Sequence, residues 1–147
     1  MPQSAQNREL FDELALVNRK LRSLFDAKVK ERGLTLSRAR ALFSLSKQDG
    51  LNQRDLAEEL DIETPTMVRL LDGMEKQGFV ERRAEQSDRR VKRVHMTDYG
   101  RSIAAEIDRL ACEIRKELLG GVEEGDVTVA LDVLRTMAGN MQAANRN

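Results

Sequence analysis

Residues 52–97, NQRDLAEELDIETPTMVRLLDGMEKQGFVERRAEQSDRRVKRVHMT, decide the fold. Asn52 is a good cap for a short helix over residues 53–60. Thr64-Pro65 has the form of a cap followed by proline at the first position of a second helix, which runs to about Gln77. Two helices joined by so short a turn are typical of a helix-turn-helix. Two runs of strand-forming residues around a polar turn at residues 85–90 then predict a β-hairpin, and this order of elements predicts a winged helix.

The second of these helices has the pattern of a DNA recognition helix. At 100° per residue its apolar side chains share one face, and the opposite face carries Pro65, Arg69, Asp72 and Lys76. Because the N-terminal end of such a helix enters the major groove, we expect Thr66 and Arg69 to meet base edges, with Arg69 suited to a bidentate contact with guanine. Thr64, Pro65 and the free N–H groups of the first turn then approach phosphates. Asp72 is spaced to orient Arg69 through a helix-surface pair, and the alternative for Arg69 is an ordinary exposed arginine.

Positive charge is concentrated on the hairpin although the chain is neutral, with 25 Lys+Arg against 25 Asp+Glu. Between residues 82 and 93 two acidic residues face six basic ones: Arg82, Arg83, Arg89, Arg90, Lys92 and Arg93. Residues 54–63, in contrast, hold one basic and five acidic residues. A basic hairpin beside a helix-turn-helix is suited to phosphates or to a narrow minor groove. The alternative is a solvated, charge-rich hairpin.

Long helices flank this region. Apolar residues that step by three and four from Leu10 predict a helix of about 20 residues that ends at Gly33. A helix capped by Thr35 or Ser37 follows, and Thr97 is placed to cap a long helix that Gly120-Gly121 breaks. A last helix runs from about Asp126. We expect one domain over residues 1–147, mainly α with a small β-hairpin: a winged helix-turn-helix over about 35–97 and dimerisation helices over about 8–32 and 98–146.

Composition excludes several classes of protein. The 147 residues contain one cysteine, Cys112, and one histidine, His95, so neither a disulfide framework nor a Cys/His zinc site can form. No nucleophile has a nearby base and no Gly-rich phosphate loop is present, so we expect no enzyme, no metal and no cofactor. No stretch has the length of a membrane span or the form of a leader, and a cytoplasmic protein without membrane contact is expected.

The terminal helices carry more apolar surface than the central domain of one chain can cover. An amphipathic helix that cannot bury its stripe alone needs a partner. We therefore expect a homodimer in which the first helix and the last two helices pack against the same elements of a second copy. The alternative is a three-helix bundle within one chain.

The stretches IETPTMVRLLDGMEKQGFVERR and SDRRVKRVHMT closely resemble the MarR family of bacterial transcription regulators, and its SlyA-like branch in particular. The most specific element is Asp-x-Arg in a basic hairpin, here Asp88 and Arg90. The resemblance implies that Asp88 holds the wing in shape by pairing with basic neighbours and that Arg90 reaches the minor groove. Arg89 is then a backbone contact. The resemblance also implies a homodimer and a pseudo-palindromic operator.

A small phenolic or aromatic carboxylate effector is a further implication of the resemblance. SlyA-like proteins use arginines of the first helix near such a ligand, and Arg19 and Arg22 match their positions. At i and i+3 these two guanidinium groups could share a carboxylate, or they are exposed charges or pairs between subunits. The aromatic or imidazole side chains found early in the second helix of those proteins are replaced here by Arg38, Ala39 and Arg40. Cys112 is expected to be a buried packing residue rather than a redox sensor.

The function indicated is that of a dimeric, sequence-specific regulator that binds double-stranded DNA. Such a protein represses by occluding polymerase or activates by displacing another DNA-bound protein, and the sequence leaves both open. The alternative function is a winged helix that binds another protein and not DNA. The positive charge of the hairpin argues against that alternative.

Overall fold

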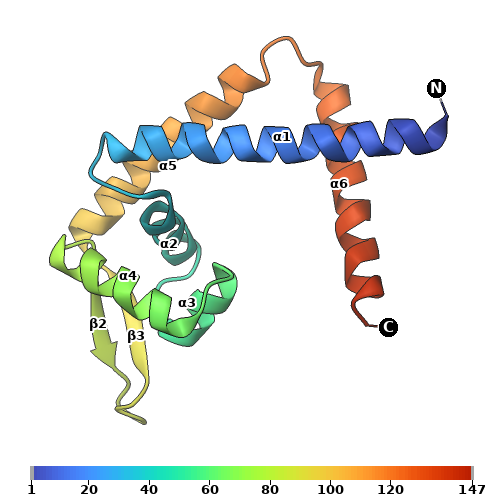
Figure 1. The fold of residues 1–147 in the computed structure, drawn as a ribbon. Coiled ribbons are helices and arrows are strands. Elements are labelled where there is room, and N and C mark those ends of the chain that lie inside the picture. Colours follow the sequence, from blue (N-terminus) through green and yellow to red (C-terminus); the bar gives the residue numbers. More distant parts are fainter. Residues whose placement is uncertain (1, 147) are drawn as a thin grey trace. The chain divides into compact units, whose positions relative to one another are not determined.

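A computed structural model describes residues 2–146 of the chain (Figure 1). The elements follow in the order α1 (Gln3–Lys30), α2 (Leu36–Lys47), β1 (Leu51–Asn52), α3 (Gln53–Glu59), α4 (Thr64–Lys76), β2 (Val80–Ala84), β3 (Lys92–Met96), α5 (Asp98–Leu118) and α6 (Glu124–Ala144). The chain divides into two compact units, of which the first ends at Ala111 and the second begins at Cys112. The first unit contains the complete winged helix-turn-helix.

Side-chain caps start three helices of the first unit. Thr35, Asn52 and Thr97 each accept a hydrogen bond from the backbone N–H three residues further on, at 3.2, 2.7 and 3.0 Å. Such a bond satisfies one of the N–H groups that have no partner within the helix. The caps predicted at Asn52 and Thr97 are confirmed, and Thr35 rather than Ser37 caps α2.

The start of α4 differs from the prediction by one residue. Glu63 occupies the cap position without a side-chain hydrogen bond, and Thr64 is already the first helical residue, so Thr64 is not the cap. Pro65 still falls in the first turn, where its missing N–H costs nothing because the first four N–H groups of a helix lack an intrahelical partner. Gly78, with a φ of +80°, ends the segment in a conformation that glycine adopts easily.

The wing belongs to a three-stranded antiparallel sheet of order β1-β3-β2. Within the hairpin, β2 pairs with β3 in a register that sets Val80 opposite Met96 and Ala84 opposite Lys92. The hairpin is confirmed, whereas the third strand was missed. That strand, β1, is only two residues long, and it pairs Leu51 with Val94. So short a strand leaves no periodic pattern in the sequence.

One hydrophobic core holds α2, α3, α4 and the sheet together. The predicted inner face of α4 is confirmed, because Met67, Leu71 and Met74 are completely buried and Leu70 packs against them. Other large side chains of this core are fully buried too: Val29, Leu34, Leu42, Leu45, Leu56, Val80, Val94 and Ile107. The buried face of α4 therefore leaves its opposite face to solvent.

The cap of α5 gives a test of the fold. Thr97 Oγ1 accepts from Gly100 N and donates to the carbonyl of Gly78, and so joins the end of the sheet to the helix start. We expect Thr97→Ala to lower the free energy of unfolding by about 1 kcal/mol, measured by urea denaturation. Thr136→Ala is the control, since Thr136 is exposed inside α6 and alanine is the better helix former there. Equal effects of the two substitutions would contradict the cap.

Both ends of the chain expose apolar side chains. In α1, which starts about five residues before the predicted residue 8, the half-exposed residues are Leu10, Phe11, Leu14 and Val17. Among the described residues of α6 none is buried. Apolar residues exposed in and around the second unit are Leu118, Leu119, Val122, Val129, Leu131, Val133, Leu134 and Met141. Cys112 is exposed too, so the prediction of a buried cysteine is wrong for the single chain.

Candidate nucleic-acid interface

The solvent-facing side of α4 displays the residues predicted to meet DNA. Thr64, Pro65, Thr66, Arg69 and Lys76 are all exposed. Thr64 begins the helix, so the free N–H groups of the first turn lie beside its side chain and that of Thr66. This end carries partial positive charge from the aligned peptide dipoles and is suited to phosphate oxygens.

Arg82 at the root of the wing lies against the same helix. Its guanidinium group donates to Asp72 at 2.6 Å and to Glu75 at 2.7 and 2.9 Å. Asp72 therefore pairs with Arg82, and the predicted pair of Asp72 with Arg69 does not occur among the described side chains. The reason is that the folded hairpin places a partly buried guanidinium beside Asp72, and this forms a stronger contact than two exposed side chains of one helix surface.

Arg82 keeps its positive charge beside the carboxylates of Glu75 and Asp72. Partial burial by itself would lower the pKa of the guanidinium, but the hydrogen bonds to Glu75 and Asp72 outweigh it and hold the pKa above its ordinary value. From the sequence, Arg82 is recognised only as one of the basic residues of the hairpin. The signal that could have identified it is a pair of acidic residues at i and i+3 on the polar face of the recognition helix, close in sequence to the arginine of the first wing strand.

A tight turn shapes the tip of the wing. The Asp88 carboxylate accepts hydrogen bonds from the backbone N–H of Arg90 at 3.1 Å and from its guanidinium at 3.1 and 3.2 Å. Hydrogen bonds from the Arg90 side chain and then its backbone lower the pKa of Asp88, so this carboxylate is ionised at neutral pH. The Arg90 side chain is 91% exposed and remains accessible.

Most of the basic residues of the hairpin have acidic partners, which the sequence did not reveal. Arg82 pairs with Asp72 and Glu75, and the other pairs are Arg83 with Glu81, Arg90 with Asp88 and Arg93 with Glu85. Arg93 also donates to the carbonyl of Gly50 at 3.0 Å, so it braces the wing against β1. Among the described residues Arg89 and Lys92 have no ion pair and are exposed. The net positive charge thus lies toward the tip.

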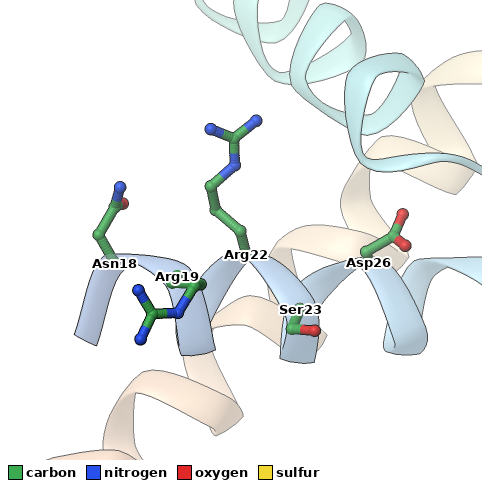
Figure 2. A pocket seen from close by; sticks show the side chains of 5 residues that line it. All are labelled: Asn18, Arg19, Arg22, Ser23 and Asp26. Carbon is green, nitrogen blue, oxygen red and sulfur yellow. The ribbon is translucent and has the colours of Figure 1, made fainter. Parts of the chain in front are cut away.

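Arg19 and Arg22 lie in a shallow hollow along α1, together with Asn18, Ser23 and Asp26 (Figure 2). Figure 2 shows their guanidinium groups pointing in different directions. Asp26 accepts a hydrogen bond from Lys30, which lowers the pKa of Asp26 and keeps it ionised. The hollow therefore holds two guanidinium groups and one carboxylate, and that carboxylate is already paired with Lys30.

His95 is half-buried at the wing root, where its Nδ1 lies 3.3 Å from a carboxylate oxygen of Asp49. It is therefore a structural contact of β3 rather than part of the tip. No group of three or more metal-ligating side chains occurs within residues 2–146. In the same range, no helix has both the length and the apolar composition needed to cross a membrane.

Helices α3 and α4 and the adjoining hairpin form a winged helix-turn-helix (Figure 1). The inner face of α4 is buried and its outer face is exposed. The family model of the MarR family matches residues 34–92. The transcriptional regulator PA3341, whose crystal structure is known, has 32% sequence identity to this chain. The two structures superpose with a TM-score of 0.80, and the match covers 91% of this chain and 98% of that chain. The chain belongs to the MarR family.

Other solved structures extend the comparison. The transcriptional regulator SlyA is 26% identical, with a TM-score of 0.80, over 90% of this chain and 93% of that one. FabT from Streptococcus pneumoniae, solved in complex with DNA, is 17% identical, with a TM-score of 0.82, over 93% and 98% of the two chains. At that identity the likeness to FabT concerns the fold.

Proposed function

We propose that this protein is a homodimeric, sequence-specific DNA-binding transcription regulator without enzymatic activity. The observation that carries the proposal is an exposed helix face next to a hairpin whose unpaired cations, Arg89 and Lys92, lie toward its tip. The likeness to regulators, one of them 32% identical over nearly its whole length, supports the same function. The SlyA-like branch is the group within the family that we favour, on the basis of the likeness to SlyA.

In this proposal α4 enters the major groove. Thr66 and Arg69 contact base edges, while Thr64, Pro65 and the first-turn N–H groups contact phosphates together with Lys76 further along the helix. The wing carries Arg90 into the adjacent minor groove, where the negative potential of a narrow groove favours a guanidinium. Asp88 holds this turn, and the cations around it, Arg89 and Lys92, neutralise phosphates.

The apolar side chains exposed at both ends of the chain support a second copy. Soluble monomers rarely expose contiguous apolar patches of more than a few hundred Å². Exposed apolar side chains recur over several turns of α1 and, separately, over several turns of the helices that follow Asp98. We propose that they pack against the same elements of a partner with two-fold symmetry, so that the winged helix of about 35–97 serves for DNA binding and the flanking helices for dimerisation. The operator is then pseudo-palindromic, with half-sites roughly 10 bp apart.

A gel shift with an excess of competitor DNA tests this function. We expect the protein to retain an operator duplex, for example one selected from the region upstream of its own coding sequence, when random duplex is in excess. A winged helix that serves only to bind other proteins would give no shifted band. If the excess of random duplex abolished the shifted band of every duplex tried, the proposal of sequence-specific binding would also be contradicted.

Arg90→Ala tests the wing. We expect weaker binding to operator and to random duplex alike, and a slope of log affinity against log salt that is smaller by about 1, because one phosphate and minor-groove contact is removed. Arg83→Ala is the control, since Arg83 is an exposed wing arginine that pairs with Glu81 on β2, away from the tip. An unchanged slope for Arg90→Ala, or an equal change for both variants, would contradict the assignment of the tip.

The proposed function includes a small aromatic carboxylate effector. A small aromatic carboxylate would bind at Arg19 and Arg22 only if their guanidinium groups turned toward each other, at a site that also holds the Asp26 carboxylate. Titration of the protein with salicylate, followed by calorimetry and by release from operator DNA, tests whether such a ligand binds there. Binding that Arg22→Ala abolishes supports the site, and no heat at millimolar salicylate excludes it.

A further inference from the structure

One guanidinium group at the root of the wing connects three elements of the DNA-binding region. Arg82 is the third residue of β2, and its side chain is only 20% exposed. It donates through Nε and Nη2 to Glu75, and through Nη2 to Asp72, both of α4. Its Nη1 lies 3.4 Å from Oε1 of Gln53, the first residue of α3.

The geometry favours a rigid connection over a loose surface pair. Asp72 and Glu75 lie three residues apart on α4, so their carboxylates project from one side of the helix, one turn from each other. A planar guanidinium with its donors in a fixed fork holds two carboxylates in a defined geometry, which the rotating ammonium of a lysine would not fix. Partial burial also reduces the screening by solvent that weakens exposed ion pairs.

The charges argue against a direct contact of Arg82 with DNA. The group of Arg82, Asp72 and Glu75 has a net charge of −1, and the donors of the guanidinium point at carboxylates rather than at solvent. A phosphate would have to compete with two carboxylates already at 2.6 and 2.7 Å. The same contacts neutralise part of the negative charge that α4 would otherwise carry into the groove.

We propose that Arg82 is a positioning residue that fixes the direction of the wing relative to the recognition helix, so that α4 and the wing tip reach their two grooves together. The inference rests on the proposed DNA-binding function and specifies how its two contact elements are kept in register. Without the connection, α4 and the hairpin remain folded on the core but the hairpin samples other directions. If the competent direction is then populated about a tenth of the time, the apparent Kd for operator rises about tenfold.

A positioning role and a direct phosphate contact of Arg82 predict opposite changes in operator affinity for one variant. The double variant Asp72→Asn/Glu75→Gln removes two negative charges near DNA, which by itself strengthens binding to phosphates. A positioning role predicts that this variant nevertheless binds operator about tenfold more weakly and loses hydroxyl-radical protection in the minor groove, while binding to random duplex is unchanged or tighter. A direct phosphate contact of Arg82 predicts tighter binding to operator, because the arginine is released.

A charge-matched control on α3 and a substitution of Arg82 itself are compared with the double variant. Glu58→Gln/Glu59→Gln on neighbouring α3 is the matched control, because it removes two exposed acidic side chains that do not contact the wing; it should leave the minor-groove protection intact. Arg82→Gln should lose the same protection as the double variant and, without DNA, show faster amide hydrogen exchange in the hairpin. Urea denaturation of each variant identifies any general loss of stability.

The outcomes separate this inference from the proposed function. Full minor-groove protection by the double variant, or unchanged hairpin exchange in Arg82→Gln, overturns the inference while the wild-type footprint still supports DNA binding. A wild-type protein that protects no duplex overturns the proposed function, and the positioning role with it.

Discussion

Leu134→Glu in α6 is expected to convert the dimer into a monomer and to abolish specific DNA binding. Leu134 is 45% exposed in the single chain, and it lies on the apolar stripe of α6 with Leu131 and Met141. In the proposed dimer this side chain is covered by the partner, and a buried carboxylate without a partner is strongly unfavourable. A monomer engages one half-site only, and loss of the second, tethered contact lowers affinity by a factor of about 100 or more.

Sedimentation velocity and a gel shift on the same preparations measure this effect. Thr136→Glu is the matched control: it introduces the same charge in the same helix, two residues on and thus on roughly the opposite face. Circular dichroism should show a folded chain in both cases, because the hydrophobic core cluster lies in the unit that ends at Ala111. A Leu134→Glu protein that sediments and binds like the Thr136→Glu control would contradict the dimer interface.

Arg69→Ala is expected to have the second largest effect. Arg69 is exposed on the outer face of α4, three residues after Thr66, and no ion pair within the described chain engages it. Loss of a bidentate contact to a base edge should weaken binding to operator by about 1 to 3 kcal/mol and relax the base preference at one position of each half-site. Binding to random duplex should change little.

Competition titrations on operator, on operators substituted base by base and on random duplex measure this prediction. Lys76→Ala is the comparison, since a phosphate contact at that place should lower affinity for all duplexes to a similar extent. If Arg69→Ala weakened binding to operator and random duplex by the same factor, Arg69 would be a backbone contact rather than a base contact.

The helical part of the fold is predictable because burial imposes a period on the sequence. The inner face of α4 follows from the spacing of Met67, Leu71 and Met74, which a helix must turn toward the core. The cap at Asn52 follows from local hydrogen bonding alone. In contrast, β1 has two residues, and its pairing with Val94 depends on how distant segments pack. Pairing of that kind leaves no trace in local sequence.

For the candidate site, the sequence predicted which residues are exposed better than it predicted which side chains they contact. The exposed places of Thr66, Arg69 and Lys76 follow from the helix period. The partner of Asp72 does not, because the fold brings Arg82 to it across the turn between α4 and the wing. Counting charges along the hairpin overestimated its free positive charge, since most of its arginines turned out to have carboxylate partners. Cys112 is exposed although a buried packing role was expected, because its place within a helix does not fix which face the fold covers.

Selection of binding sites from a pool of random duplexes probes the whole proposed mode of binding, because it requires α4, the wing and the two-fold axis to act together. This mode of binding predicts enrichment of an inverted repeat whose half-sites lie roughly 10 bp apart, each with a preferred base at the place of Arg69 and a flanking A·T-rich step at the wing. A selected pool without any common sequence, or with a single unrepeated half-site, would contradict it.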